Sequence, residues 1–278
     1  EWSKANPERA SQWKAAHEDL LPADIEKVLP AFDPAKPVAT RTASGLVLNA
    51  LAQALPQLVG GSADLAPSNM TWLKEMGEIK PGDFAGRNFH FGIRELAMAA
   101  IMNGVQVHGG FRIFGGTFFV FSDYLKGALR LSAIMKLPVI YVLTHASIGV
   151  GEDGPTHEPI EHLAALRATP GVTVFRPADG KETAAGYVLA LQNQGPTCLV
   201  LTRQNLPTYA ETGPEALKGG YILRSAETPD IILLASGSEV ELVMKAADVL
   251  EGLGIAARVV SMPSMELFEQ QAAAWRQQ

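Results

Sequence analysis

The chain has 278 residues, of which 47% are hydrophobic and 19% are charged. This composition is globular and excludes a disordered, collagen-like or coiled-coil protein. The formal net charge of −6 argues against nucleic-acid binding, which needs a basic surface. No apolar run approaches the roughly 18 residues that span a bilayer, and no signal-like segment opens the chain. The only cysteine, Cys198, excludes an internal disulfide and favours a cytoplasmic protein.

The two ends of the chain indicate a piece of a larger or processed protein. The sequence begins with Glu1 rather than Met and stops at Gln278 within a helical pattern. Residues 1–37 mix acidic and basic residues with scattered Trp and Leu, which predicts one or two short amphipathic helices in a linker. We expect this linker to pack on a neighbouring surface.

From residue 38 onward, helical and strand patterns alternate. The predicted elements are, in order, a helix at 44–55, a strand at 58–60, an almost wholly buried helix at 92–105, a helix from about Phe118, a strand at 137–145, a helix at 158–168, a strand at 172–178, a helix at 181–193 and a strand at 198–203. This repetition predicts an α/β domain over 38–220, with a mostly parallel central sheet and helices on both faces.

After Gly219 and Gly220 the pattern restarts. The sequence predicts a strand at 230–238, a helix at 238–254 and a further strand at 257–263. One such unit cannot cover both faces of its sheet. We therefore expect residues 221–278 to begin a second, incomplete α/β domain.

Glu95 is the first candidate for chemistry. It lies in FGIRELAMAA, where apolar residues flank it and Arg94 is the neighbouring cation. A carboxyl group shielded in such a helix can donate or share a proton in a reaction. The alternative, which the pattern alone favours, is a plain Glu–Arg pair at the start of a helix.

A polar loop follows the predicted strand at 137–145. His145 and His157 bracket Glu152 and Asp153 in this loop, and their spacing matches no zinc motif. Ligands collect at the carboxyl ends of strands in open α/β sheets. The loop therefore predicts either a hydrogen-bonding site for a polyhydroxylated ligand or a surface turn with solvated histidines.

Three further polar residues, Arg41, Ser68 and Arg203, lie in separate loops. Arginine binds phosphate through paired N–H groups, and serine adds a neutral donor. The sequence alone does not bring the three together, and a lone arginine after a strand is usually solvated or ion-paired.

Phe118, Phe121 and Tyr124 follow each other at intervals of three residues, which would place them on one helical face. Such an aromatic stripe usually packs in a core. Motifs for nucleotide phosphates, dinucleotides, serine hydrolases and dithiol chemistry are absent from the sequence.

The sequence resembles the transketolase family. The segments that carry the resemblance are GSADLAPSN, HFGIRELAMAA, GGTFFVFSDY, GVGEDGPTHEPIEHLAALRATP and TRQNL, which occur in the family's order at similar spacing. Together they span residues 38–206, and GSEVE with RVVSMPS extends the match. The resemblance implies the thiamine-diphosphate-binding fold, with 38–220 as the pyrimidine-binding domain, 221–278 as a truncated C-terminal domain and 1–37 as the linker that precedes them.

This resemblance implies an enzyme of the pentose phosphate pathway. Such an enzyme moves a two-carbon ketol unit from a ketose phosphate, such as xylulose 5-phosphate, to an aldose phosphate, such as ribose 5-phosphate. Glu95 matches the catalytic glutamate, whose carboxyl group hydrogen-bonds the pyrimidine ring of thiamine diphosphate. Phe121 matches the aromatic residue stacked on that ring, and Phe118 and Tyr124 complete the wall.

The resemblance also implies a set of substrate-binding residues. Arg41, Ser68 and Arg203 match the residues that hold the substrate phosphate. His145 and His157 match contacts to the sugar oxygens. Asp153 matches the residue that reads the configuration of a hydroxyl group, a type of contact that discriminates strongly.

Two family features are missing. The family commonly has Asp where this chain has Ala146, so we expect His145 to be oriented differently or to lack a partner. The motif that binds diphosphate and metal, G-D-G followed by Asn roughly 25–30 residues later, is absent. The resemblance thus implies that the diphosphate and its Mg²⁺ or Ca²⁺ are held by a domain outside this chain.

Two functions remain open on the sequence. The chain is either one part of a transketolase, inactive alone, or a catalytically silent dimerisation and binding fragment. The enzyme would be a homodimer or a complex with a chain that carries the diphosphate-binding domain. Related ketol transferases such as dihydroxyacetone synthase share much of this site, whereas GIRELAM and GEDGPTHEP disfavour deoxyxylulose-phosphate synthase. We expect no nucleic-acid or membrane partner.

Overall fold

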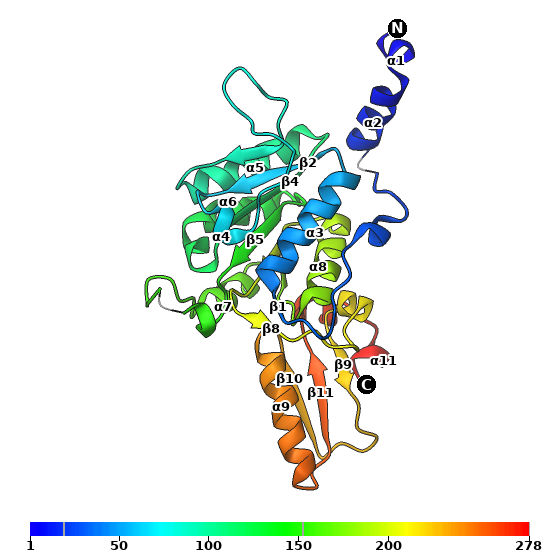
Figure 1. Cartoon of the computed structure of the whole chain (residues 1–278), viewed down its shortest axis with the longest axis vertical. Helices are drawn as coiled ribbons and strands as arrows, with labels where there is room; N and C mark the ends of the chain where they lie inside the picture. Colours follow the sequence, from blue (N-terminus) through cyan, green and yellow to red (C-terminus); the bar gives the residue numbers. More distant parts are fainter. Residues whose placement is uncertain (19, 152, 278) are drawn as a thin grey trace.

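A six-stranded parallel sheet forms the centre of the larger part of the molecule (Figure 1). The computed structural model describes residues 1–18, 20–151 and 153–277. The strands lie in the order β3-β2-β4-β5-β7-β6, and each neighbouring pair is parallel. Their bounds are β2 (Leu58–Ser62), β3 (Asn88–His90), β4 (Arg112–Phe118), β5 (Ile140–Thr144), β6 (Thr173–Phe175) and β7 (Thr197–Val200).

Helices cover both faces of this sheet, which confirms the predicted fold class. α3 (Thr40–Ala54) and α8 (Gly180–Gln192) pack on one face, where Ile140 and Val142 of β5 join their core. α5 (Glu95–His108) and α6 (Ser122–Ile134) pack on the other, with Tyr141 and Leu143 of β5. The alternation along β5 follows from the period of two in a strand. Two shorter helices are α4 (Ala66–Asn69) and α7 (His162–Arg167).

The central strand β4 was not predicted from the sequence. It contains Gly115 and Gly116, which have low strand propensity and no side chain to reveal the pattern. A Cβ at Gly115 would overlap the sulfur of Met102, and a Cβ at Gly116 would lie 2.7 Å from Cγ2 of Thr71. The glycines therefore allow neighbouring layers to approach β4 closely.

The helix predicted from about Phe118 begins later, at Ser122. Phe118 is the last residue of β4, and a 3₁₀ helix, η2 (Phe119–Phe121), separates it from α6. The prediction missed this boundary because it did not recognise the strand before it.

α5 is less buried than predicted. Met98 and Met102 are fully buried, but Leu96, Ile101 and Val107 are between 46% and 59% exposed. The helix therefore has an apolar face turned away from its own core, and Leu131 and Ile134 of α6 are also exposed. This second apolar face is what made the sequence predict complete burial.

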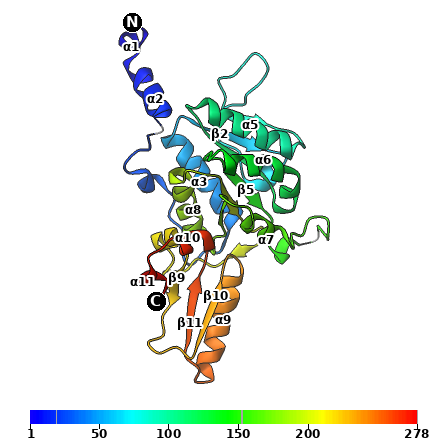
Figure 2. The ribbon, with the colours of Figure 1, turned by 180° about the vertical axis from the view of Figure 1, so that it is seen from behind.

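A separate three-stranded sheet follows, in the order β10-β11-β9 (Figures 1 and 2). β10 (Ile231–Ala235) and β11 (Ala257–Ser261) are parallel, and β9 (Tyr221–Arg224) is antiparallel to β11. α9 (Glu239–Gly252) packs on β10 and β11, while Ile232 and Leu234 are about half exposed. This is the predicted second, partial α/β domain. The remaining elements here are η4 (Pro214–Lys218), α10 (Met265–Glu269) and α11 (Ala273–Arg276).

Glu182 of α8 joins the two sheets. Its buried carboxylate accepts hydrogen bonds from the hydroxyls of Tyr221 on β9, at 2.7 Å, and of Ser261 on β11, at 2.6 Å. The amide of Ala178 donates a third at 2.7 Å. Burial, together with the nearby Asp179, raises the pKa of Glu182 to about 7.

The N-terminal segment packs on the body only in part. α1 (Trp2–Ala5) and α2 (Pro7–His17) bury no residue and extend away from the sheet, contrary to the expected packing (Figure 1). Packing begins at the end of α2, where His17 approaches Gly110, and continues with the buried Ile25 of η1 (Ile25–Val28).

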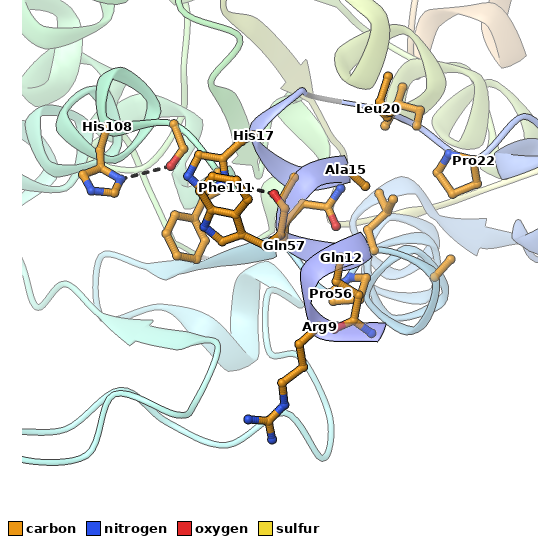
Figure 3. A pocket seen from close by; sticks show the side chains of 17 residues that line it. Arg9, Gln12, Ala15, His17, Leu20, Pro22, Pro56, Gln57, His108 and Phe111 are labelled. Carbon is orange, nitrogen blue, oxygen red and sulfur yellow. Dashed lines mark hydrogen bonds between the residues drawn. The ribbon is translucent and has the colours of Figure 1, made fainter. Parts of the chain in front are cut away.

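A cavity of about 670 Å³ lies where α2 meets the body, between this helix, residues 54–57 and residues 108–111 (Figure 3). Among the described residues, no helix has the length and apolar character needed to cross a membrane.

We predict that Glu182→Gln destabilises the protein, because the amide presents N–H groups to neighbours that are themselves donors. A loss of about 1–3 kcal/mol is expected. The carboxyl pKa is higher in the folded chain than in the unfolded one, so its stabilising contribution is full below about pH 4.5 and is lost as the pH rises to about 7.

Thermal unfolding at several pH values measures this effect, with the exposed Glu227→Gln as the control. The gap between wild type and Glu182→Gln should be larger at low pH. A gap that does not change with pH would contradict the assignment.

Candidate active site at the carboxyl edge of the sheet

The candidate residues lie in segments that follow the carboxyl ends of five neighbouring parallel strands. In the order of the sheet, these are Glu95 after β3, Ser68 after β2, Phe121 after β4, His145 with Asp153 and His157 after β5, and Arg203 after β7. Parallel strands bring loops that are distant in sequence to one edge. The residues that the sequence singled out therefore share this edge.

Arg41 reaches the edge through a small additional sheet. β1 (Val38–Ala39) pairs with β8 (Asn205–Leu206), and the Oγ1 atom of Thr40 accepts a hydrogen bond from the amide of Thr202 at 2.7 Å. These contacts hold the first turn of α3 beside the end of β7. Arg41 is in that turn, so it lies near Arg203, although 162 residues separate them in the sequence.

Arg41 contacts two other predicted site residues, Ser68 and His145. Its Nη1 atom donates to the carbonyl oxygen of Ser68 at 2.8 Å and lies 3.5 Å from Nε2 of His145. Burial, and then the charge of Arg203, lower the pKa of the Arg41 guanidinium. Among the described residues neither arginine forms a salt bridge, and Nε of Arg41 is buried without a hydrogen-bond partner. The pair therefore offers positive charge to an anion.

His145 is a buried imidazole in a strained backbone position. Its φ is +62°, and its side chain is 3% exposed. Burial, and then the charge of Arg41, lower the pKa of His145 to about 4, although Asp153 opposes this effect. The imidazole is therefore neutral at physiological pH and can act as a hydrogen-bond acceptor through one nitrogen.

Phe118 and Phe121 form an aromatic wall next to the histidines. Their rings are nearly parallel, at 7°, with centroids 5.9 Å apart. Phe118 also packs on His145 at 3.7 Å, and His157 meets Phe121 edge-on at 5.3 Å. Tyr124 continues the row at 6.2 Å from Phe121 but is 66% exposed.

The prediction of a core-packed helical stripe for these aromatics was wrong. Only Tyr124 lies in α6, because Phe118 ends β4 and Phe121 ends η2. Phe118 is buried, Phe121 is half-buried and Tyr124 is exposed, so the row runs from the core to the surface.

Glu95 is the first residue of α5, and it is only 7% exposed. Among the described residues its carboxylate forms no hydrogen bond or salt bridge. Arg94 does not pair with it and instead donates to the carbonyl oxygen of Phe91 at 3.4 Å. The simple Glu–Arg pair expected from the pattern is therefore not formed. Within the described ranges, no hydrogen bond or ion pair connects Glu95 to the cluster around His145, although both lie at the same edge.

The exposed residues of the site lie in the loop after β5 and at the end of β7. Asp153 and Arg203 are exposed, and His157 is half-buried with Nδ1 2.8 Å from the hydroxyl of Thr156. A Cβ at Gly151 would lie 2.9 Å from Nη1 of Arg203, so this loop and Arg203 are in contact. Glu152 of the same loop lies outside the described residues.

The sequence did not identify the residues that orient His145. Oγ1 of Thr144 lies 2.9 Å from its Nδ1 and donates to Oδ1 of Asn69 at 2.6 Å. His145 therefore has a partner even with Ala146 in place of Asp, contrary to one of the two expectations. The methyl group of Ala146 packs into the core. The sequence signal was the position of Thr144 at the end of an apolar strand and of Asn69 in the polar segment that follows β2.

His162 was assigned no role from the sequence, yet it is buried and its Nε2 lies 3.1 Å from Asp123. Glu161 is close enough for the three to share a cation. Lys126 already pairs with Asp123 at 2.7 Å. The group is best explained as an ionic contact that connects α6 to α7.

We predict that His145 stays neutral from about pH 5 to 8, because its pKa lies near 4. Its ring ¹⁵N and ¹³C shifts should be constant over this range in the folded protein. In the denaturant-unfolded protein the same ring should titrate near about 6.5. Arg41→Gln should raise the pKa by removing the nearest positive charge, and titration of the wild type near neutral pH would refute the assignment.

Comparisons with known proteins agree on one family. The family description "Transketolase, pyrimidine binding domain" matches residues 36–208, and "Transketolase-like TK C-terminal domain" matches 219–278. Transketolase of Geobacillus stearothermophilus is 55% identical over 282 residues, which cover 99% of this chain and 42% of that protein.

Two solved structures extend this comparison. Transketolase of Pichia stipitis in complex with sedoheptulose 7-phosphate matches with a TM-score of 0.96 and 45% identity, over 99% of this chain and 42% of that one. A split-gene transketolase described as an inactive β4 tetramer matches with a TM-score of 0.68 and 32% identity, over 83% of this chain and 73% of that one. Although this chain spans only about two fifths of the length of the first relative (42%), it belongs to the transketolase family.

Proposed function

We propose that this chain supplies the pyrimidine-binding half of a thiamine-diphosphate-dependent transketolase site. The complete enzyme would transfer a two-carbon ketol unit from a ketose phosphate to an aldose phosphate, as in the pentose phosphate pathway. The observation that carries this proposal is the convergence of Arg41, Arg203 and a neutral His145 beside an aromatic wall. That arrangement combines an anion site with a hydrogen-bonding site, which is what a sugar phosphate requires.

The substrate phosphate would bind between Arg41 and Arg203, with Ser68 beside them. Neither arginine has an acidic partner among the described residues, so a phosphate would provide the missing negative charge. The buried, unpartnered Nε atom of Arg41 is a further donor for it. The related Pichia stipitis structure is described as a complex with a sugar phosphate, which supports this class of ligand.

The sugar chain would extend from the arginines toward the aromatic wall. His145 lies 3.5 Å from Arg41 and packs on Phe118, so it stands between the two regions. His157 would contact sugar oxygens near the reacting carbons. Asp153 would accept a hydrogen bond from a hydroxyl of defined configuration, because the wrong epimer would leave a polar group unpaired.

The residues of this chain fit the aminopyrimidine of the cofactor. Phe121 offers a flat ring next to Phe118, and Tyr124 extends the wall. Glu95 is only 7% exposed, and its carboxylate has no hydrogen-bond or ion-pair partner among the described residues, so it is available to hold a proton at a pyrimidine nitrogen. When bound, thiamine diphosphate supplies the nucleophilic carbon and the electron sink of the reaction.

The other half of the site would come from a diphosphate-binding domain that carries Mg²⁺ or Ca²⁺. Two observations support assembly with a second polypeptide surface. The exposed apolar face formed by Leu96 and Ile101 of α5 and Leu131 and Ile134 of α6 is typical of an interface. Ile148, in the loop after β5, is 92% exposed. We infer a homodimer of the complete protein, or a complex with a separate diphosphate-binding chain.

A second candidate function is a catalytically silent assembly module. The similar split-gene transketolase is described as an inactive tetramer, which favours this alternative for a chain of this extent. The cytoplasmic location stays a prediction, since relatives include chloroplast proteins.

We predict that this chain alone is inactive and that a chain carrying the diphosphate-binding domain restores transfer from xylulose 5-phosphate to ribose 5-phosphate. In the assembled enzyme, Glu95→Gln should lower kcat by about 10²–10⁴-fold, the usual contribution of a positioned proton-transfer group. Its unfolding temperature should match that of wild type.

Glu227→Gln, which changes an exposed carboxylate remote from the edge, is the matched control. Turnover by the chain alone would contradict the proposal that half of the active site comes from a separate diphosphate-binding domain. Full activity of Glu95→Gln would contradict the proposed role of Glu95. Assembly without any turnover would favour the silent module.

A further inference from the structure

A short segment after β5 is held against the end of β7 by a side-chain hydrogen bond. The hydroxyl of Ser147 donates to Oε1 of Gln204 at 2.7 Å and accepts from the amide of Gly149 at 3.1 Å. Ser147 is only 4% exposed, and Gln204 is half-buried. This hydrogen bond, called here the Ser147–Gln204 clamp, joins positions 57 residues apart in the sequence.

Two glycines of this segment allow the close approach. A Cβ at Gly149 would lie 2.8 Å from Cδ of Gln204, and a Cβ at Gly151 would lie 2.9 Å from Nη1 of Arg203. Gly151 also has a φ of +103°, which glycine adopts without steric cost. Alternate residues of the segment, beginning with Ser147, therefore contact the end of β7.

The end of β7 and the start of the segment are each fixed by other hydrogen bonds. Oγ1 of Thr202 donates to the backbone carbonyl oxygen of Gln204 at 3.1 Å, and the Thr202 amide donates to Oγ1 of Thr40 at 2.7 Å. The amide of Ala146 donates to the carbonyl oxygen of Leu201 at 3.0 Å. The clamp therefore acts on the residues that follow Ala146, which have no such backbone anchor among the described residues.

Asp153 follows Gly151 by two residues and acts on the same site. Its negative charge opposes the lowering of the His145 pKa, so its carboxylate lies within electrostatic range of the imidazole. Arg203, which the proposed function assigns to the substrate phosphate, contacts Gly151 directly. The segment therefore connects a carboxylate that would read a hydroxyl group to a guanidinium that would hold a phosphate.

We propose that Ser147 and Gln204 are positioning residues that hold Asp153 at a set distance from the phosphate site, and that this distance determines which hydroxyl epimer the enzyme accepts. The identity of the substrate rests on the proposed function, but the clamp does not. In a sugar phosphate each hydroxyl lies a fixed number of bonds from the phosphate. A carboxylate held at one distance from the phosphate therefore reads one carbon, and the wrong epimer leaves it unpaired. If the segment moves freely, Asp153 adapts to either epimer and the discrimination is lost.

The first experiment measures the clamp without reference to activity. Amide hydrogen exchange is followed in the complete protein that contains this chain, free of cofactor and substrate. Gln204→Met removes the acceptor of the Ser147 hydroxyl, so that hydroxyl no longer holds the Gly149 amide in place. The Gly149 amide should exchange about tenfold faster, the effect of one lost hydrogen bond, while the Ala146 amide should not change. Unchanged exchange at Gly149 would overturn the proposal.

Three variants break the clamp by different routes. Gln204→Met and Ser147→Ala each remove one hydrogen-bonding group, and the double variant should cost no more than either single one, because both break the same bond. Gly149→Ala keeps both groups but places a Cβ against the Gln204 amide. Gln192→Met makes the same chemical change at the exposed last residue of α8 and is the matched control. Far-UV circular dichroism and unfolding temperature verify that each variant is folded, and if one is not, the other two still decide.

The second experiment measures specificity in the assembled enzyme with two pairs of epimers. The acceptors are ribose 5-phosphate and arabinose 5-phosphate, and the donors are xylulose 5-phosphate and ribulose 5-phosphate. The larger of the two wild-type ratios of kcat/KM should fall about tenfold in each variant. The inhibition constant of inorganic phosphate should stay within about twofold, because Arg41 and Arg203 are held by α3 and β7 rather than by the clamp.

The outcomes separate this proposal from the proposed function. Faster exchange at Gly149 together with a lower epimer ratio supports the positioning role. A retained ratio in all three variants, or an equal loss of phosphate affinity, would overturn it. A wild-type enzyme without transfer or without epimer preference would instead refute the proposed function or its assignment of Asp153, and the exchange of the Gly149 amide would still decide whether the clamp exists.

Discussion

The close approach of other layers to the central strand β4 is the constraint on which the site depends. Gly116 has no side chain, so the Asn69 and Thr71 side chains can lie against its backbone. Its carbonyl oxygen also accepts from Ser62, which binds the Asn69 amide. A Cβ at this position would lie 2.7 Å from Cγ2 of Thr71 and 3.3 Å from Nδ2 of Asn69, so a larger residue would displace Thr71 and disturb the hydrogen bond from Asn69 to Ser62. The orientation of the His145 imidazole therefore depends on close packing against β4, a strand that the sequence pattern did not predict.

The candidate site at the carboxyl edge of the sheet is positively charged, although the whole chain carries a formal net charge of −6. Arg41 and Arg203 lie near each other without an acidic partner among the described residues, and burial, with the charges of the two arginines added to it, lowers the pKa of His145. A like-charged pair held at one sheet edge is unfavourable unless an anion joins it. The repulsion between the two arginines persists because β1–β8 pairing and the Thr40–Thr202 hydrogen bonds hold the first turn of α3 beside the end of β7.

Much of the fold and part of the site could be predicted from the sequence. The apolar run of β5 and the helical pattern of α9 were clear because side chains carry their periodicity. β4 was missed because Gly115 and Gly116 carry none, and the boundary at Phe118 was lost with it. The loops that contain His145 and Asp153 were recognised as polar strand ends, and a family resemblance supplied their expected roles. Thr144 and Asn69 were missed because they look like ordinary turn residues, and their contact joins positions 75 residues apart.

The buried carboxylate of Glu182 has a consequence for motion. Any rotation of the C-terminal sheet away from α8 would break the hydrogen bonds that the Glu182 carboxyl group accepts from the Tyr221 and Ser261 hydroxyls. Because the stabilising contribution of Glu182 is full below about pH 4.5 and is lost as the pH rises to about 7, this restraint on rotation is strongest in acid. One buried carboxyl group therefore couples the relative motion of the two sheets to pH.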